Sequence, residues 1–120
     1  MSNMNAKGNY LGEFEELVLL SAASLEDAYG VSIMQYIINE AGRNVNISAV
    51  HEVLKRLERK GYVRSKMGGA TNERGGRRKR FFVLTASGRK TLEEIMKLKL
   101  RLYGQVPDFS LKPVRQIVKT

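Results

Sequence analysis

Residues 47–65 read ISAVHEVLKRLERKGYVRS, and this stretch decides the fold that the sequence predicts. Apolar residues recur in it at the spacing of one helix face, so we expect a helix from about Ala49 to Lys60. Ser48 precedes this helix and can cap it, because its hydroxyl can accept a hydrogen bond from an exposed backbone N–H. Gly61 ends the helix, and the residues after it are typical of a strand. The apolar face consists of Val50, Val53, Leu54 and Leu57.

The other side of this helix is polar and mostly cationic. At 100° per residue, the face opposite the apolar one holds Ser48, Glu52, Lys55 and Arg59, and the flanks hold Ala49, His51 and Arg56. Taken alone, such a helix fits a solvated surface helix as well as one that contacts nucleic acid. Glu52 either accepts a hydrogen bond from a cytosine amino group or pairs with Arg56 four residues later, and we prefer the pairing. His51 fits a plain surface residue and a phosphate donor equally well.

Two short strands follow, joined by a glycine-rich basic loop. Residues 62–67 and 79–85 have the character of strands, and the loop between them covers residues 68–78, so we expect a long-looped hairpin. Residues 68–80, the loop and the start of the second strand, contain one acid, Glu73, and the five cations Arg74, Arg77, Arg78, Lys79 and Arg80. The charge can simply keep a loop in solution, but beside the cationic helix it favours contact with a phosphate backbone or a minor groove.

The period of two in the second strand divides its side chains between two faces. Lys79 and Phe81 should share one face, and Arg80 and Phe82 the other. Only some of these cations can therefore point at one partner together. Arg77 and Arg78, where the loop joins the strand, are the best placed to reach a nucleic-acid partner.

Two further helices precede this unit and one follows it. Residues 11–30 are nearly continuously apolar after Glu16, which predicts a helix buried on more than one side. Residues 31–42 predict a second, amphipathic helix that stops at Gly42. Thr85 can cap the last helix, which carries more apolar surface than one small core requires and so indicates a dimer interface. The expected interface residues are Phe14, Leu17, Leu92, Ile95, Met96, Leu102 and Tyr103.

The predicted fold class is mainly α with a minor β component: a winged helix-turn-helix with a two-stranded wing and a C-terminal dimerisation helix. We expect an N-terminal arm over residues 1–9, a winged helix-turn-helix domain over 10–85, the dimerisation helix over 86–104 and a tail over 105–120. Tyr10, Tyr29 and Tyr36 are expected to pack in the core or an interface. A ligand pocket lined by these aromatic residues is the less favoured alternative.

The composition excludes several classes of function. The 120 residues include 21 Lys and Arg against 12 Asp and Glu, a formal charge of +9, which favours a polyanionic partner such as nucleic acid. There is no cysteine and one histidine, so thiolate and multi-histidine metal sites are excluded, and we expect no cofactor. No signal peptide or membrane-spanning run is visible, so we expect a cytoplasmic protein without a membrane partner.

Three segments together resemble one family. They are AYGVSIMQYI at residues 28–37, ISAVHEVLKRLERKGYV at 47–63 and GGRRKRFFVLTASGR at 75–89, the last of which contains a Thr-x-x-Gly start to the final helix. In this order and spacing they resemble the PadR family of bacterial transcriptional regulators, and the likeness extends over roughly residues 10–103. Many members have a tyrosine where this chain has His51, which changes that contact without removing a hydrogen-bond donor.

The resemblance implies a winged helix that binds double-stranded DNA as a homodimer on an inverted repeat, usually as a repressor. The alternative function is a protein-interaction module whose basic wing docks an acidic partner. An enzyme is the least favoured of the three functions, because no paired carboxylates, Ser/His/Asp set or phosphate-binding glycine loop stand out. The sequence leaves open the operator, the regulated genes and whether a small-molecule effector exists.

Overall fold

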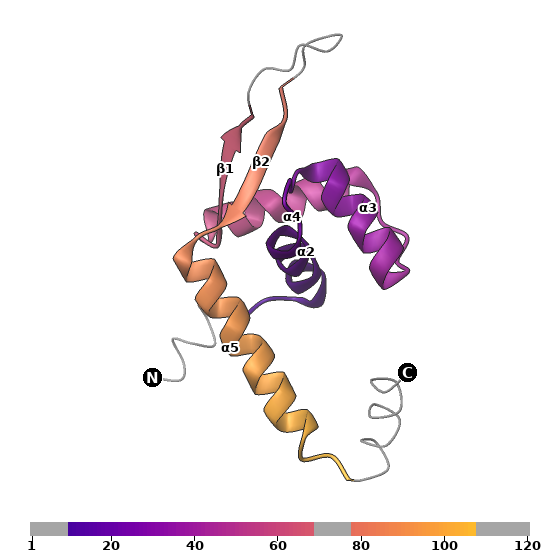
Figure 1. Cartoon of the computed structure of the whole chain (residues 1–120), viewed down its shortest axis with the longest axis vertical. Coiled ribbons are helices and arrows are strands. Elements are labelled where there is room, and N and C mark those ends of the chain that lie inside the picture. Colours follow the sequence, from indigo (N-terminus) through magenta and orange to yellow (C-terminus); the bar gives the residue numbers. More distant parts are fainter. Residues whose placement is uncertain (1–9, 69–77, 108–120) are drawn as a thin grey trace.

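The computed structural model describes residues 10–68 and 78–107 of the chain. These residues form four helices and one two-stranded antiparallel sheet, which confirms the predicted fold class (Figure 1). The elements are α2 (Glu13–Ser24), α3 (Gly30–Ala41), α4 (Ile47–Arg59), β1 (Val63–Met67), β2 (Arg80–Leu84) and α5 (Ala86–Tyr103). The expected arm, most of the wing loop and the tail from residue 108 lie outside the described residues.

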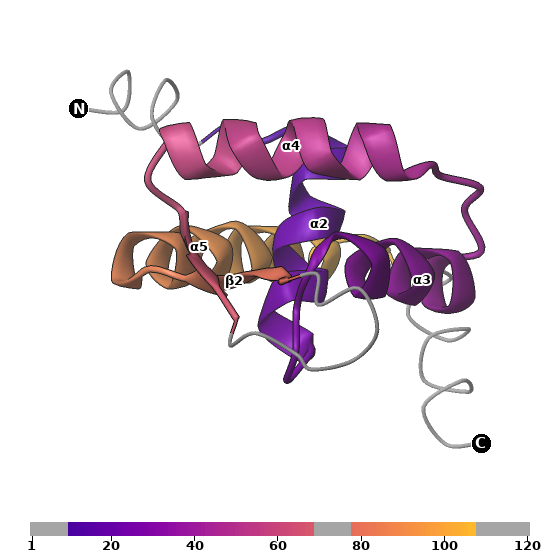
Figure 2. The same ribbon diagram turned by 90° about the horizontal axis from the view of Figure 1, so that it is seen from above.

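The helix α2 occupies the centre of the molecule. It contacts α3, α4, α5 and β2, and Figure 2 shows it running from α4 toward α3 and α5. Its residues Val18 and Leu19 have no exposed surface at all. A helix with neighbours on several sides must be apolar on several sides. The nearly continuous apolar character of this stretch therefore reflects burial within one protomer. The other largest fully buried side chains are Ile33, Ile37, Val50, Leu54, Leu57 and Val63.

Local chemistry sets the helix ends, and one predicted cap is wrong. Gly42 ends α3 in the left-handed conformation with φ of 65°, as predicted. Thr85 caps α5, because its Oγ1 accepts a hydrogen bond from the Gly88 N–H at 2.9 Å, also as predicted. The cap of α4, however, is Asn46 and not Ser48. Asn46 Oδ1 accepts from the Ala49 N–H at 2.8 Å, so the helix begins two residues earlier than expected and Ser48 lies in its first turn.

The hairpin of β1 and β2 is tied to the helices at its base. Val63 pairs with Leu84 at the helix-proximal end of the sheet. The Phe82 N–H donates to the Ala28 carbonyl at 2.9 Å, and the Phe82 side chain is buried. Beyond this base the hairpin extends away from the helices, as Figure 1 shows. The base of the hairpin is thus part of the core, and it supports the distal end, which extends away from the core.

The two halves of α5 have different surroundings. In the first half, Gly88, Thr91 and Leu92 are buried. Leu92 is only 8% exposed and packs in the core of its own protomer, so little of its side chain is left for the expected dimer interface. Leu92 lies one turn after Gly88, which sits against the Tyr62 backbone, so the same helix face turns inward at both positions. The second half extends beyond the core, toward the opposite end of the molecule from the hairpin (Figure 1).

Within residues 10–68 and 78–107, no helix combines the length and apolar character needed to cross a bilayer.

Candidate nucleic-acid interface

The two faces of α4 separate as the sequence predicts. The inward residues Val50, Val53, Leu54 and Leu57 are all buried. The residues of the opposite face, Ser48, Glu52, Lys55 and Arg59, are all exposed. On the flanks, His51 is exposed, and Ala49 and Arg56 are partly exposed. The apolar face fixes the helix to the core, and its polar face is free to meet a partner.

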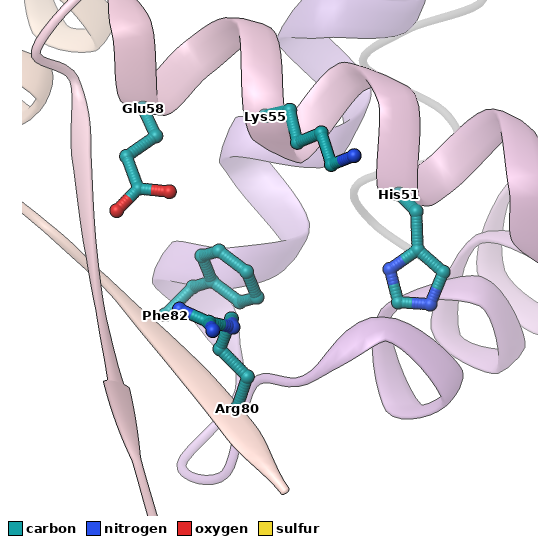
Figure 3. A pocket seen from close by; sticks show the side chains of 5 residues that line it. All are labelled: His51, Lys55, Glu58, Arg80 and Phe82. Carbon is teal, nitrogen blue, oxygen red and sulfur yellow. The ribbon is translucent and has the colours of Figure 1, made fainter.

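A pocket of about 430 Å³ lies between α4 and the wing strand β2. As Figure 3 shows, His51, Lys55 and Glu58 reach it from α4, and Arg80 and Phe82 reach it from β2. Helix spacing explains the first three residues, because positions 51, 55 and 58 recur at intervals of four and three along one flank. Strand alternation explains the other two, since residues 80 and 82 share a face. The pocket therefore joins one flank of α4 to the strand face that Arg80 and Phe82 were predicted to share.

A chain of hydrogen bonds fixes the wing against α4 across this pocket. Arg80 Nη1 donates to Ser65 Oγ at 3.0 Å, and Ser65 Oγ donates to Glu58 Oε2 at 2.9 Å. The antiparallel pairing of Ser65 with Phe82 brings these groups together. The carboxylate of Glu58 is thereby engaged, and the Arg80 guanidinium is held at the pocket. Sequence reasoning did not single out Glu58 or Ser65, because only the register of the hairpin brings them close.

The opposite face of β2 is fixed by an aromatic contact. The rings of Tyr29 and Phe81 meet edge to face, with centroids 5.6 Å apart. Lys79 Nζ lies 4.4 Å from the centroid of the same Tyr29 ring, within the range of a cation–π contact. The predicted pairing of Lys79 with Phe81 on one strand face is thus confirmed. Tyr29 precedes α3, so the wing is held by α3 on one face and by α4 on the other.

The wing cations are only partly within the described residues. Arg78, Lys79 and Arg80 are exposed, whereas Arg74 and Arg77 lie outside the described residues.

His51 packs beside the first residue of α3. A Cβ atom at Gly30 would lie 2.6 Å from His51 Cε1, so any larger residue at position 30 would require the imidazole to move. This close approach gives a physical reason for a glycine at the start of the second predicted helix.

Arg56 lies on the flank of α4 that faces away from the wing. Its Nε is 3.4 Å from Glu15 Oε2, and the predicted ion pair with Glu52 is therefore wrong. The Glu15 side chain is only 12% exposed, whereas Glu52 is on the solvated face. An exposed pair four residues apart contributes only about 0.3–0.5 kcal/mol. A less screened carboxylate attracts the guanidinium more strongly, so the contact between helices displaces the local pair.

The expected interface residues fall into three groups. Leu92 is buried in the core, as described above. Four others, Phe14, Leu17, Ile95 and Met96, are partly buried against the core. The last two, Leu102 and Tyr103, are 50% and 36% exposed. Leu98 and Leu100 extend this apolar surface with exposures of 46% and 70%. The second half of α5 therefore presents a large apolar surface in the isolated protomer.

A second, smaller pocket of about 260 Å³ lies between α2 and α3. Leu17, Leu20, Tyr36 and Ile37 contribute its apolar lining. Tyr36 and Tyr29 are both partly buried, as expected of packing aromatics, but Tyr10 is 77% exposed.

In the described part of the chain, no group of three or more His, Asp or Glu side chains is arranged to hold a metal ion.

Comparisons with known proteins agree with this geometry. The chain is 31% identical to smu.1704 of Streptococcus mutans UA159 over 75% of this chain and 77% of that one, with a TM-score of 0.58. A PadR-like transcription factor from Bacteroides fragilis is 22% identical and has a TM-score of 0.65, over 97% and 95% of the two chains. The chain is also 21% identical to RosR from H. salinarum in a complex structure, with a TM-score of 0.67, over 96% of this chain and 92% of that one.

No curated protein matches the chain. The model of the transcriptional regulator PadR-like family matches residues 19–94, which include the second half of α2, all of α3 and α4, both wing strands and the first half of α5. That family consists of transcriptional regulators and not of enzymes. The chain therefore belongs to the PadR-like family of transcriptional regulators.

Proposed function

We propose that this protein is a sequence-specific DNA-binding repressor that acts in the cytoplasm as a homodimer on an inverted-repeat operator. One observation carries the proposal: the exposed face of α4 is continuous, through the pocket of His51, Lys55 and Arg80, with the basic wing. A formal charge of +9 on 120 residues gives the electrostatic attraction that such a partner requires.

In this proposal α4 enters the major groove. A helix with side chains is about 10–12 Å across and fits a groove about 12 Å wide. Ser48 and Ala49 would approach base edges near the start of the helix, followed by Glu52 and Arg59 along it. Because Arg56 pairs with Glu15, Glu52 is left to accept a hydrogen bond from a cytosine amino group. The buried inner face would hold this orientation.

The phosphate backbone of one DNA strand would lie over the pocket between α4 and the wing. His51, Lys55 and Arg80 all line that space, and each can donate a hydrogen bond to a phosphate oxygen. Arg78, together with the loop residues Arg74 and Arg77, would continue the contact along the backbone or in the minor groove. Lys79 would help to position the wing rather than contact DNA, because its ammonium group lies over the Tyr29 ring.

The homodimer would form through the second half of α5. Its exposed leucines at positions 98 and 102 lie one turn apart on the same side of the helix and form an apolar surface of the kind that marks an interface. A second copy related by a two-fold axis would present two α4 helices about 34 Å apart, one turn of DNA. Residues 86–104 then have two roles, since their first half completes the core and their second half joins the protomers.

The test is a titration of the whole protein with duplexes from the DNA that flanks its own gene, followed by fluorescence anisotropy. The proposal predicts one duplex bound at least about 10³-fold more tightly than a scrambled one at physiological salt. Light scattering should give the mass of a dimer, and transcription from the bound promoter in vitro should fall. Failure to bind any duplex would contradict the proposal and favour docking of an acidic protein by the wing.

A further inference from the structure

The first turn of α2 carries three carboxylates, and each reaches a cation on a different part of the fold. They differ in burial, since the side chain of Glu13 is 68% exposed and those of Glu15 and Glu16 are each 12% exposed. The pairs are Glu13 with Arg43, Glu15 with Arg56 and Lys60, and Glu16 with Lys99. Only the second of these engages the helix that we propose to bind DNA.

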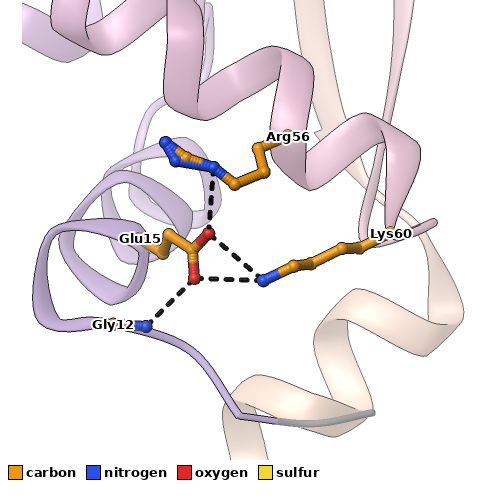
Figure 4. A network of polar contacts seen from close by, with 4 residues as sticks. All are labelled: Gly12, Glu15, Arg56 and Lys60. Atoms are coloured by element: carbon orange, nitrogen blue, oxygen red, sulfur yellow. Dashed lines mark hydrogen bonds and ion pairs between the residues drawn. The ribbon is translucent and has the colours of Figure 1, made fainter. Parts of the chain in front are cut away.

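The carboxylate of Glu15 accepts contacts from three groups, as Figure 4 shows. The Gly12 N–H donates to Oε1 at 3.0 Å, which completes the start of α2. Lys60 Nζ donates to both oxygens at 3.2 Å, and Arg56 Nε lies 3.4 Å from Oε2. Because Glu15 is largely buried, these charges are screened less than surface pairs are.

The position of Arg56 relative to bound DNA follows from the geometry of α4. A helix inside the major groove has a phosphate backbone on each side, because its diameter nearly fills the groove. On one flank the wing side offers His51, Lys55 and Arg80 to the phosphates. On the other flank Arg56, with a side chain 39% exposed, has the length to reach the second backbone. Its guanidinium is instead directed inward to Glu15.

We propose that Glu15 is a positioning residue that withholds Arg56 from DNA phosphate. This inference rests on the proposed function and adds to it a reason for the buried carboxylate. A phosphate contact strengthens binding to every DNA sequence and carries no base information. By engaging Arg56, Glu15 limits the affinity for random DNA, so that recognition depends more on the outward face of α4 and on the wing.

The test measures the salt dependence of binding to a scrambled duplex. Glu15→Gln removes the charge but keeps an oxygen that can accept from the Gly12 N–H. We expect the log affinity against log salt slope to steepen by about 0.9, and random DNA to bind about fivefold more tightly at ~0.15 M salt, as one added phosphate contact requires. A merely structural role for Glu15 would instead weaken operator binding and leave the slope unchanged.

Arg56→Gln supplies the second arm. In the parent it should leave the slope unchanged, because Arg56 does not contact phosphate there, and in Glu15→Gln it should abolish the gain. A slope that flattens by about 0.9 for Arg56→Gln in the parent would overturn the proposal. This arm also decides the matter if Glu15→Gln fails to fold, which circular dichroism would reveal.

Glu16→Gln is the matched control. It removes the same charge from the same turn, from a side chain of equal exposure, but its partner Lys99 is on α5. It should leave the slope unchanged, and equal steepening by both glutamine variants would also overturn the proposal. If the parent protein binds no duplex at all, the proposed function fails, whereas a binding parent with no response to Glu15→Gln contradicts this inference alone.

Discussion

The inner and outer faces of α4 differ in what holds them and in what they offer. The inner face is closed, since Val50 and Leu57 have no exposed surface and Leu54 has 1%. The outer face carries Lys55 and Arg59 into solvent. One helix thus combines a part of the core with a surface for a partner. A substitution on the inner face should change the free energy of unfolding, and one on the outer face should change binding.

The largest expected effect tests the inner face. Leu57→Ala should lower the free energy of unfolding by about 2–5 kcal/mol, because it removes buried contacts and leaves a cavity. Urea denaturation followed by circular dichroism measures this change. A variant with the parent's transition midpoint would mean that α4 does not pack as described.

The next effect tests whether the first half of α5 belongs to the same core. Gly88→Ala should destabilise the protein by about 1–3 kcal/mol. Its Cβ would lie 2.0 Å from the Tyr62 carbonyl oxygen, a backbone atom that has little freedom to move. Thermal unfolding measures the resulting decrease in melting temperature. The control is Gly104→Ala at the other end of α5, where the nearest atoms are 3.5 Å away and no comparable loss is expected.

The second half of α5 should behave as an outer surface. Leu102 is 50% exposed, so Leu102→Ser should change the unfolding of the protomer little. It should weaken the dimer by about tenfold or more, since burial of a leucine contributes about 1.5–3 kcal/mol. Sedimentation over a range of concentrations measures both species. A dimer of unchanged affinity would remove this half of the helix from the interface.

The smallest effect concerns the wing. Arg78→Ala should flatten the log affinity against log salt slope by about 0.9, on operator and scrambled duplex alike, if its contact is to phosphate. A loss confined to operators with A·T-rich flanks would instead indicate an arginine in a narrow minor groove. An unchanged slope on both duplexes would exclude Arg78 from the binding surface.

Local patterns predicted the elements and faces well because they depend on neighbours in the sequence. The faces of α4 follow from 100° per residue, and the sharing of a strand face by Lys79 and Phe81 follows from alternation. The cap of α4 was harder, because Asn46 and Ser48 are both good capping residues two positions apart. Asn46 has the extended backbone of a capping residue, with ψ of 165°, whereas Ser48 already lies within the helix.

Contacts between distant segments could not be predicted in this way. Glu15 and Lys60 are 45 positions apart, and only the packing of α2 on α4 brings them together. The local rule favoured Glu52 as the partner of Arg56, and the tertiary contact displaced it. The same limit explains Leu92, whose apolar character alone does not distinguish the core from an interface.

The most direct test of the account compares two double variants that each remove two exposed cations. One is Lys55→Ala with Arg59→Ala on the outer face of α4, and the other is Arg89→Ala with Lys90→Ala on α5. Anisotropy titrations of the operator duplex should show the first weakened at least about 30-fold, since each hydrogen bond from a cation to a base or a phosphate contributes about 1–3 kcal/mol. The second should bind within about threefold of the parent, the change expected of net charge alone. Both should melt like the parent. Equal losses in the two variants, or none in the first, would contradict the assignment of α4 as the helix that binds DNA.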